Sequence, residues 1–148
     1  MLSSYAVADR APALPAVEMV FMNLEKVVFG FFIVLAATLN FGFFIGDIDN
    51  PTHHHIYELF AAIVVNLIAT VLKFGDRTQI GAVHLSTSLV ADLQLVAAAC
   101  VWAIAVHVTG EGMSANVTTS VVSLSGGALL ANFVSLVLLI AETVMLRR

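Results

Sequence analysis

The sequence predicts an all-α membrane protein, in which four antiparallel transmembrane helices form one bundle. Two observations lead to this prediction. Of the 148 residues, 60% are hydrophobic and only 11% are charged, whereas a soluble domain averages roughly 45–50% apolar and about 25% charged residues. The apolar residues also gather in four runs, and each is close to or above the length of about 20 residues that a membrane-spanning helix needs. The chain is therefore too apolar for a water-soluble domain.

We expect the four spans at residues 27–45, 56–74, 81–108 and 117–146. Charged or turn-forming residues mark the ends of these runs, as Asp47 and Asp49 do after the first. The last two runs are longer than the bilayer requires, so these helices are expected to tilt or to extend beyond the hydrocarbon. Residues 1–21 are expected to form a cytoplasmic tail or interfacial segment, and residues 22–148 the transmembrane domain.

The basic residues indicate the direction in which the helices run. They occur only before the first span, beside the turn between the second and third, and after the fourth: Arg10, Lys26, Lys73, Arg77, Arg147 and Arg148. The other two loops contain no Lys or Arg. Because short loops rich in Lys and Arg stay in the cytoplasm, both termini are expected on the cytoplasmic side.

The connecting segments are expected to be short. Residues 73–79 form a tight turn, so the second and third spans should pair as an antiparallel hairpin. Asn50 and Pro51 suit a helix start, with Asn as the cap and Pro at the first helical position. The three histidines at residues 53–55 are then expected in the first turns of the second helix.

Polar residues near the middle of the membrane are the most informative feature of the sequence. They are Asn66 in the second span, Asp92 and Gln94 in the third and Asn132 in the fourth, with Asn40 of the first span about a turn toward the outer side. An Asp at the centre of a bilayer costs about 2.5–3.5 kcal/mol. These side chains are therefore expected to face the interior of the bundle and to find partners there.

Two interpretations of this polar layer remain open. In the first, the carboxamides form hydrogen bonds between helices and hold the bundle together, with Asp92 protonated. In the second, Asp92 and the amide oxygens bind a proton or a monovalent cation, because hard cations prefer oxygen ligands and ionisable groups inside membranes often mark ion pathways. No Lys or Arg lies at the depth of Asp92, which favours protonation or a bound cation over a salt bridge.

The third span carries a polar stripe. His84, Ser88 and Asp92 follow one another at a spacing of four residues, so they share one helix face. The stripe leads from the cytoplasmic end to the middle of the membrane. It is either a half-channel for protons or the face that packs against Asn66 and Thr70 of the second span.

Small residues form a seam along the fourth span. They recur at a spacing of four: Thr119, Ser123, Gly127, Ala131 and Ser135. Such a seam lets another helix approach closely. The partner helix is either one from the same chain or one from another subunit, so a homo-oligomer or a membrane-protein partner is expected beside the lipid bilayer.

Acidic residues and histidines gather in the first outer loop and at the start of the second span. The candidate metal ligands are Asp47, Asp49, His54 and Glu58. His54 and Glu58 are four residues apart and would share a helix face, and histidine titrates near neutral pH. The alternatives are a divalent-metal site, a pH-sensing site and a solvated loop with no ligand. The spacing matches no established zinc or calcium motif, so no divalent metal cofactor is expected.

Three segments resemble a family of small bacterial inner-membrane proteins of unknown function. They are residues 40–51 (NFGFFIGDIDNP), 73–81 (KFGDRTQIG) and 123–127 (SLSGG). The resemblance extends from Met22 onward. It implies a bacterial inner membrane and four spans, and it implies no activity, ligand or catalytic residue.

Composition and motifs also narrow the function. The chain has no basic patch for nucleic acid, and its single cysteine, Cys100, forms no intrachain disulfide and supplies no thiolate metal site. Without a catalytic triad, a phosphate-binding loop or a zinc motif, an enzyme is not expected. Two functions remain: a small oligomeric ion- or proton-conducting protein with Asp92 as its central carboxylate, or a non-catalytic accessory or assembly subunit of a membrane complex. The one non-protein ligand considered is a monovalent cation.

Overall fold

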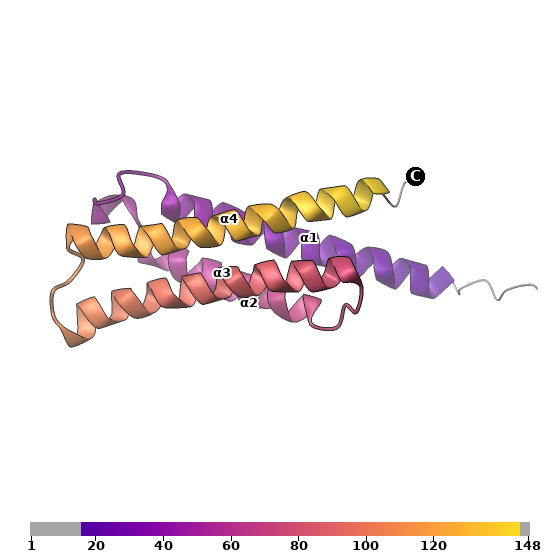
Figure 1. Ribbon diagram of the computed structural model, residues 1–148, viewed down its shortest axis with the longest axis horizontal. Helices are drawn as coiled ribbons and strands as arrows, with labels where there is room; N and C mark the ends of the chain where they lie inside the picture. Colours follow the sequence, from indigo (N-terminus) through magenta and orange to yellow (C-terminus); the bar gives the residue numbers. More distant parts are fainter. Residues whose placement is uncertain (1–15, 146–148) are drawn as a thin grey trace, which may run out of the picture.

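The computed structural model describes residues 16–145, and this part of the chain is an antiparallel bundle of long helices with no β-strand (Figure 1). α1 spans Ala16–Phe44, α2 Ile56–Lys73, α3 Gln79–Ala103 and α4 Ala115–Met145. A 3-10 turn, η1, lies at Pro51–His53, and a π-helical turn, η2, continues α3 through Ile104–Val108. The all-α prediction is therefore confirmed.

All four helices are long and apolar enough to cross a membrane. The candidate spans are Leu24–Phe44, Ile56–Lys73, Gln79–Val108 and Ala115–Met145, which match the expected spans within three residues at every end. α1 begins at Ala16, before the domain boundary expected at residue 22, because no proline interrupts the chain between Pro15 and Pro51. The expected tail at residues 1–15 lies outside the described residues. The chain is a multi-pass integral membrane protein.

The helices form a ring in which each packs against two neighbours. α1 packs on α2 and α4, and α3 packs on the same two helices, with the most extensive contact between α3 and α4. The bundle has two distinct ends (Figure 1). We call the end with Lys26, Lys73 and Arg77 the basic end, and the end with the loops at residues 45–55 and 109–114 the loop end.

Two apolar clusters fill the interior. The larger one lies toward the loop end and includes Phe43, Leu59, Leu95, Val121 and Val122, all fully buried. The smaller one lies toward the basic end and consists of Phe29, Ile33 and Ala69. The outer surface is also apolar, and its large exposed side chains include Val71, Leu93 and Leu130. An apolar exterior of this kind suits contact with lipid.

The first loop corrects one expectation. Asn50 does act as a cap, because its side chain accepts the N–H of Thr52 at 3.1 Å, but it caps η1. α2 begins only at Ile56, so the prediction that the three histidines lie in the first turns of α2 is wrong. His54 has an extended backbone, with φ −122° and ψ 95°, and this conformation interrupts the helix. Its ring turns back toward the end of α1 instead.

Candidate functional site

Asp92 lies on α3 in the interior of the bundle, with 7% of its surface exposed. Its Oδ1 accepts a hydrogen bond from Nδ2 of Asn66 at 2.7 Å, and its Oδ2 accepts one from Oγ1 of Thr70 at 2.5 Å. Within the part of the chain that the structure describes, no ion pair includes Asp92. This face of α3 thus contacts Asn66 and Thr70, as one of the two alternatives for the stripe expected.

Asn66 connects the carboxylate to the backbone of α3. Its Nδ2 also donates to the carbonyl of Ser88 at 3.3 Å. The amide oxygen of Asn66 and the hydroxyl of Ser88 are both buried without a hydrogen-bond partner. Buried polar groups rarely stay unpaired, and bound water or an ion commonly satisfies them. The neighbourhood of Asp92 therefore has free donor and acceptor capacity.

His84 occupies the basic end of the same stripe. Its ring is fully buried and stands edge-on to the ring of Phe29, with the ring centroids 5.1 Å apart. Neither ring nitrogen has a hydrogen-bond partner, and Nε2 lies 4.0 Å from Oε2 of Glu142 on α4. The stripe of His84, Ser88 and Asp92 is thus buried along its whole length.

The other predicted members of the polar layer have separate surroundings. Asn40 bonds to α4, because its Oδ1 accepts the hydroxyl hydrogen of Ser125 at 2.5 Å. Gln94 is half-buried and its amide lies against Gly127. Asn132 is fully buried, and both of its amide atoms lack partners. The structure therefore joins Asn66, but not Asn40, to the carboxylate of Asp92.

Asn132 nevertheless lies within about one helical turn of the level of Asp92. α3 and α4 are antiparallel, and they meet at Gln94 and Gly127 and again at a hydrogen bond between Thr87 and Ser135. Asn132 falls between these two contacts on α4, as Asp92 falls between them on α3. An amide with no hydrogen-bond partner is therefore held near the depth of the carboxylate.

The seam on α4 has two halves with different surroundings. Gly127, Ala131 and Ser135 lie toward the basic end, where Gly127 and Ser135 contact side chains of α3. Ser123 and Thr119 lie toward the loop end and are exposed. For its basic-end half, the partner helix of the seam is thus α3 of the same chain.

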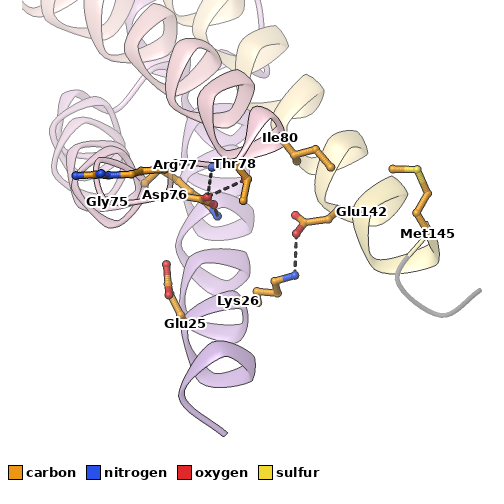
Figure 2. Close-up of a pocket in the computed structure, with 10 residues that line it drawn as sticks. Glu25, Lys26, Gly75, Asp76, Arg77, Thr78, Ile80, Glu142 and Met145 are labelled. Carbon is orange, nitrogen blue, oxygen red and sulfur yellow. Dashed lines mark hydrogen bonds and ion pairs between the residues drawn. The ribbon is translucent and has the colours of Figure 1, made fainter. Parts of the chain in front are cut away.

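A pocket of about 670 Å³ opens at the basic end, between α1, the α2–α3 turn and the end of α4 (Figure 2). Its charged lining residues are Glu25, Lys26, Lys73, Asp76, Arg77 and Glu142. Nζ of Lys26 pairs with Oε1 of Glu142 at 2.7 Å across the pocket (Figure 2). Because the other carboxylate oxygen of Glu142 faces His84, Glu142 connects this pocket to the buried stripe.

Asp76 organises the turn beside the pocket. Its carboxylate accepts hydrogen bonds from the backbone N–H and the hydroxyl of Thr78, and it pairs with Nζ of Lys73 at 3.0 Å. Burial by itself would raise the pKa of Asp76, but the bonds from Thr78 and the charge of Lys73 outweigh it and lower the pKa to about 2. Lys73 also lies over the ring of Phe29, 4.4 Å from its centroid. The buried ammonium of Lys73 is thus neutralised locally.

The candidate metal ligands of the loop end are not brought together. Both ring nitrogens of His54 face backbone carbonyl oxygens, and the carboxylate of Glu58 lies against Gly42 of α1. Asp47 and Asp49 are exposed. Among the described residues, no group of three or more His, Cys, Asp or Glu side chains has a geometry suited to a metal ion. The arrangement therefore offers no support for a divalent-metal site.

The sequence reasoning missed several polar partners. Ser125 was not singled out, although it lies on the buried face of α4 with Asn132, seven residues further along. Residues that far apart share a helix face, so this spacing was the available signal. The ion pair of Lys26 with Glu142 joins α1 to α4. No local sequence pattern predicts that these two helices are neighbours, so none could have indicated the pair.

Comparison with known proteins identifies a family without an assigned activity. No curated protein and no solved structure matches the chain. Residues 53–143, which are more than half of the chain, match a family of unknown function, DUF6394. This match agrees with the resemblance of the sequence to small membrane proteins of unknown function. The chain belongs to the family of unknown function DUF6394.

Proposed function

We propose that this integral membrane protein is a small, non-enzymatic proton-conducting protein whose central proton-binding group is Asp92. The observation that carries the proposal is the buried carboxylate itself. It has two hydrogen-bond donors and no basic partner within the described residues, and it ends a stripe that begins beside a pocket at one end of the bundle. Ionisable groups placed in this way often serve proton transfer.

The donors at Asp92 favour a proton over a metal cation. Each carboxylate oxygen already accepts one hydrogen bond, so a cation would share the carboxylate with the donors Asn66 and Thr70, whose hydrogens point toward the same oxygens. A proton is accommodated without this conflict, because a hydroxyl group both donates and accepts. When Oδ2 of Asp92 is protonated, it can donate to Oγ1 of Thr70, and the heavy atoms keep their positions. The bound monovalent cation considered for this site is therefore the less favoured ligand.

The stripe supplies groups that relay protons. An imidazole can take a proton on one nitrogen and release one from the other, and both nitrogens of His84 are free to do so. The unpartnered hydroxyl of Ser88 lies one turn nearer Asp92. These groups are separated by helical turns, so water molecules must bridge them, and buried polar groups without protein partners are where such waters bind. Glu142 then links His84 to the pocket at the basic end.

The loop-end half of the bundle bears on the end from which protons reach Asp92. Fully buried apolar residues, among them Leu59, Leu95 and Val121, fill the interior on that side. Protons therefore reach Asp92 from the basic end, and their release toward the loop end requires this apolar cluster to open. By the positive-inside rule, the basic end faces the cytoplasm of a bacterial inner membrane. On this proposal, proton binding is rapid and transfer across the membrane is slow.

The test is proton flux in proteoliposomes loaded with a pH-sensitive dye. The wild-type protein is compared with Asp92→Asn, which removes the charge and nearly keeps the shape, after both pass circular dichroism and size-exclusion checks. Asp49→Asn is the matched control, because Asp49 is exposed in the loop. We expect flux in the wild type and in Asp49→Asn, and its loss in Asp92→Asn. An absence of wild-type proton flux at every pH and membrane potential applied contradicts proton conduction.

Proton binding is measured separately by infrared spectroscopy. A protonated carboxyl group has a carbonyl stretch that a carboxylate lacks, so a pH-dependent band that disappears in Asp92→Asn assigns the proton to this residue. The measurement is repeated in Ser88→Ala, which keeps Asp92 and interrupts the stripe. We expect the Asp92 band to persist in Ser88→Ala while flux falls. An equal flux in Ser88→Ala and wild type would contradict the assigned path.

A second candidate is an accessory or assembly subunit. It is favoured by the loop-end half of the seam, where Thr119 and Ser123 are exposed and available to a helix outside the bundle. Ser123→Cys in a Cys100→Ala background tests it by disulfide crosslinking in membranes. A crosslinked dimer supports a homo-oligomer, a crosslink to another membrane protein supports an accessory role, and an uncrosslinked chain under oxidising conditions contradicts both. Leu93→Cys, on an exposed face of α3, is the control for random collision.

A further inference from the structure

His54 closes the first loop onto the end of α1. Its ring is 4% exposed. Nδ1 lies 2.5 Å from the carbonyl oxygen of Phe43, and Nε2 lies 2.9 Å from the carbonyl oxygen of Asp47. The ring also packs against that of Phe43, with the centroids 5.6 Å apart. A buried imidazole is thus held between two backbone acceptors.

The carbonyl of Phe43 belongs to the last turn of α1, whereas that of Asp47 lies in the following loop and also accepts the N–H of Asn50 at 3.0 Å. The last carbonyls of an α-helix have no N–H four residues further on to accept. In this protein the N–H of Asp47, which follows Phe43 by four residues, points instead to Nδ1 of His53 at 3.1 Å. His54 therefore supplies the donor that the chain withholds from Phe43. Gly46 permits this reversal, because its φ is +125° and a Cβ there would lie 2.8 Å from Cβ of His53.

The two contacts have one chemical consequence. A neutral imidazole has a single N–H, and its other nitrogen presents a lone pair; the imidazolium ion has two N–H groups. The two N···O contacts on opposite sides of the ring are therefore both hydrogen bonds only when the ring is protonated, although the carbonyl of Asp47 also accepts the N–H of Asn50 at 3.0 Å. The negative end of the α1 helix dipole also favours a cation at this place.

The charged surroundings are consistent with a cation. The titratable groups on the segments that pack here are Asp47 and Asp49 in the loop, His53 and His55 beside His54, and Tyr57 and Glu58 in the first turn of α2. The packed part of α4 carries no titratable side chain before Glu142, at the opposite end. Three carboxylates and two exposed histidines thus lie within seven residues of His54 in the sequence, and no Lys or Arg lies in this loop.

We infer that His54 is a proton-binding site at the loop end, and that its imidazolium form clamps residues 45–55 onto α1. Loss of the proton removes one of the two hydrogen bonds and leaves a carbonyl facing a nitrogen lone pair inside the protein, which loosens the loop. The inference does not rest on proton conduction through Asp92, because it concerns different residues at the opposite end of the bundle. It makes the order of this loop dependent on the pH of the compartment that it faces.

Hydrogen exchange measured by mass spectrometry tests the clamp in lipid nanodiscs. Exchange of the peptide covering residues 43–58 is followed between about pH 5.5 and about pH 8, the range in which histidine titrates, and each rate is divided by its intrinsic chemical rate. In the wild type we expect about tenfold greater protection at the acidic limit, as loss of a charge-assisted hydrogen bond implies. His54→Phe keeps an aromatic ring without donors, so its protection should be low at both limits.

His55→Phe is the matched control, because His55 is exposed and adjacent. Its protection should keep the pH dependence of the wild type. If His54→Phe keeps that dependence, the clamp is refuted. Nitrogen-15 spectra of histidine-labelled wild-type protein give a second readout, which does not depend on whether a variant folds. Two similar ring-nitrogen shifts for His54 at about pH 5.5 identify the imidazolium, whereas widely separated shifts at that pH identify a neutral ring and overturn the inference.

Discussion

The hydroxyl of Thr70 lies 2.5 Å from Oδ2 of Asp92, one helical turn along α2 from the amide of Asn66 that binds the other carboxylate oxygen. One short stretch of α2 thus supplies both donors to a carboxylate on α3. The two donors differ in one respect. When the carboxyl gains a proton, the hydroxyl of Thr70 can change from donor to acceptor, whereas the NH2 group of Asn66 only donates. This relationship makes the α2–α3 hairpin a structural unit and, on the proposed function, also the proton-binding unit.

Replacing Thr70 by Val removes the hydroxyl and nearly keeps the shape. One oxygen of Asp92 then loses its partner inside the protein, so we expect the free energy of unfolding to fall by about 1–3 kcal/mol. The measurement is unfolding of the purified protein by titration with a denaturing detergent. Thr143→Val is the control, because Thr143 is exposed and its hydroxyl donates only to the carbonyl of Leu139 in its own helix. Equal losses in the two variants would show that the contact with Asp92 contributes nothing specific.

Gly127 marks the closest approach of α4 to the side chain of Gln94. A Cβ at this position would lie 1.8 Å from Oε1 of Gln94, so Gly127→Ala forces that side chain to move. We expect a loss of about 1 kcal/mol of stability, at the low end for overpacking, because the displaced group is the end of a flexible side chain. The same unfolding titration measures it.

A second substitution identifies the cause of that loss. Adding Gln94→Ala to Gly127→Ala removes the clash, so the double variant should be more stable than the sum of the two single changes predicts. Gly75→Ala is the control, because a Cβ there meets nothing within 4 Å. Additive effects of the two substitutions would rule out the proposed steric contact between α3 and α4.

The helices were predictable from the sequence because long apolar runs have one solution in lipid, where every backbone group must find a partner within the segment. The pairing of Asp92 with the Asn66 and Thr70 face was also predictable, since residues four apart share a helix face and a hairpin places the two faces together. The rotation of α4 about its own axis was not predictable from the sequence. Its small-residue seam indicated close packing, yet periodicity alone does not say which neighbour the seam meets.

The first loop shows a different limit. Asn50 and Pro51 are a genuine start signal, and they do start a helical turn. Whether that turn continues into α2 depends on His54, whose ring binds the carbonyls of Phe43 at the end of α1 and of Asp47 in the loop. Those partners precede it by seven and eleven residues and come together only after the chain has reversed at Gly46. Local sequence rules do not include a contact that tertiary structure creates.

Asp76 should give the basic end a measurable acid sensitivity. Its pKa is lowered from 3.8 to about 2 in the folded protein, so the ionised form stabilises the fold. This stabilisation is complete above the unfolded-state pKa and is lost as the pH falls from 3.8 toward 2. We therefore expect the Tm difference between wild type and Asp76→Asn to shrink over that interval. Asp49→Asn is the exposed control, and its Tm should differ little from that of the wild type at every pH. A Tm difference between wild type and Asp76→Asn that does not depend on pH would contradict the role assigned to Thr78 and Lys73.

The orientation of the bundle is open to direct measurement, because each end has an exposed charged residue. Arg77 lies at the basic end and Glu111 in the loop at the opposite end, and both are exposed. In a Cys100→Ala background, Arg77→Cys and Glu111→Cys are treated with a membrane-impermeant maleimide in intact bacterial spheroplasts. The positive-inside rule predicts that Glu111→Cys is labelled at once and Arg77→Cys only after the membrane is permeabilised. The reverse pattern would invert the bundle and place the pocket and Glu142 outside the cell, so that protons would enter the stripe from the external medium. Labelling of both variants in intact spheroplasts would instead place the two ends on one side of the membrane. That result would contradict the bundle, because α3 crosses the membrane once between Arg77 and Glu111.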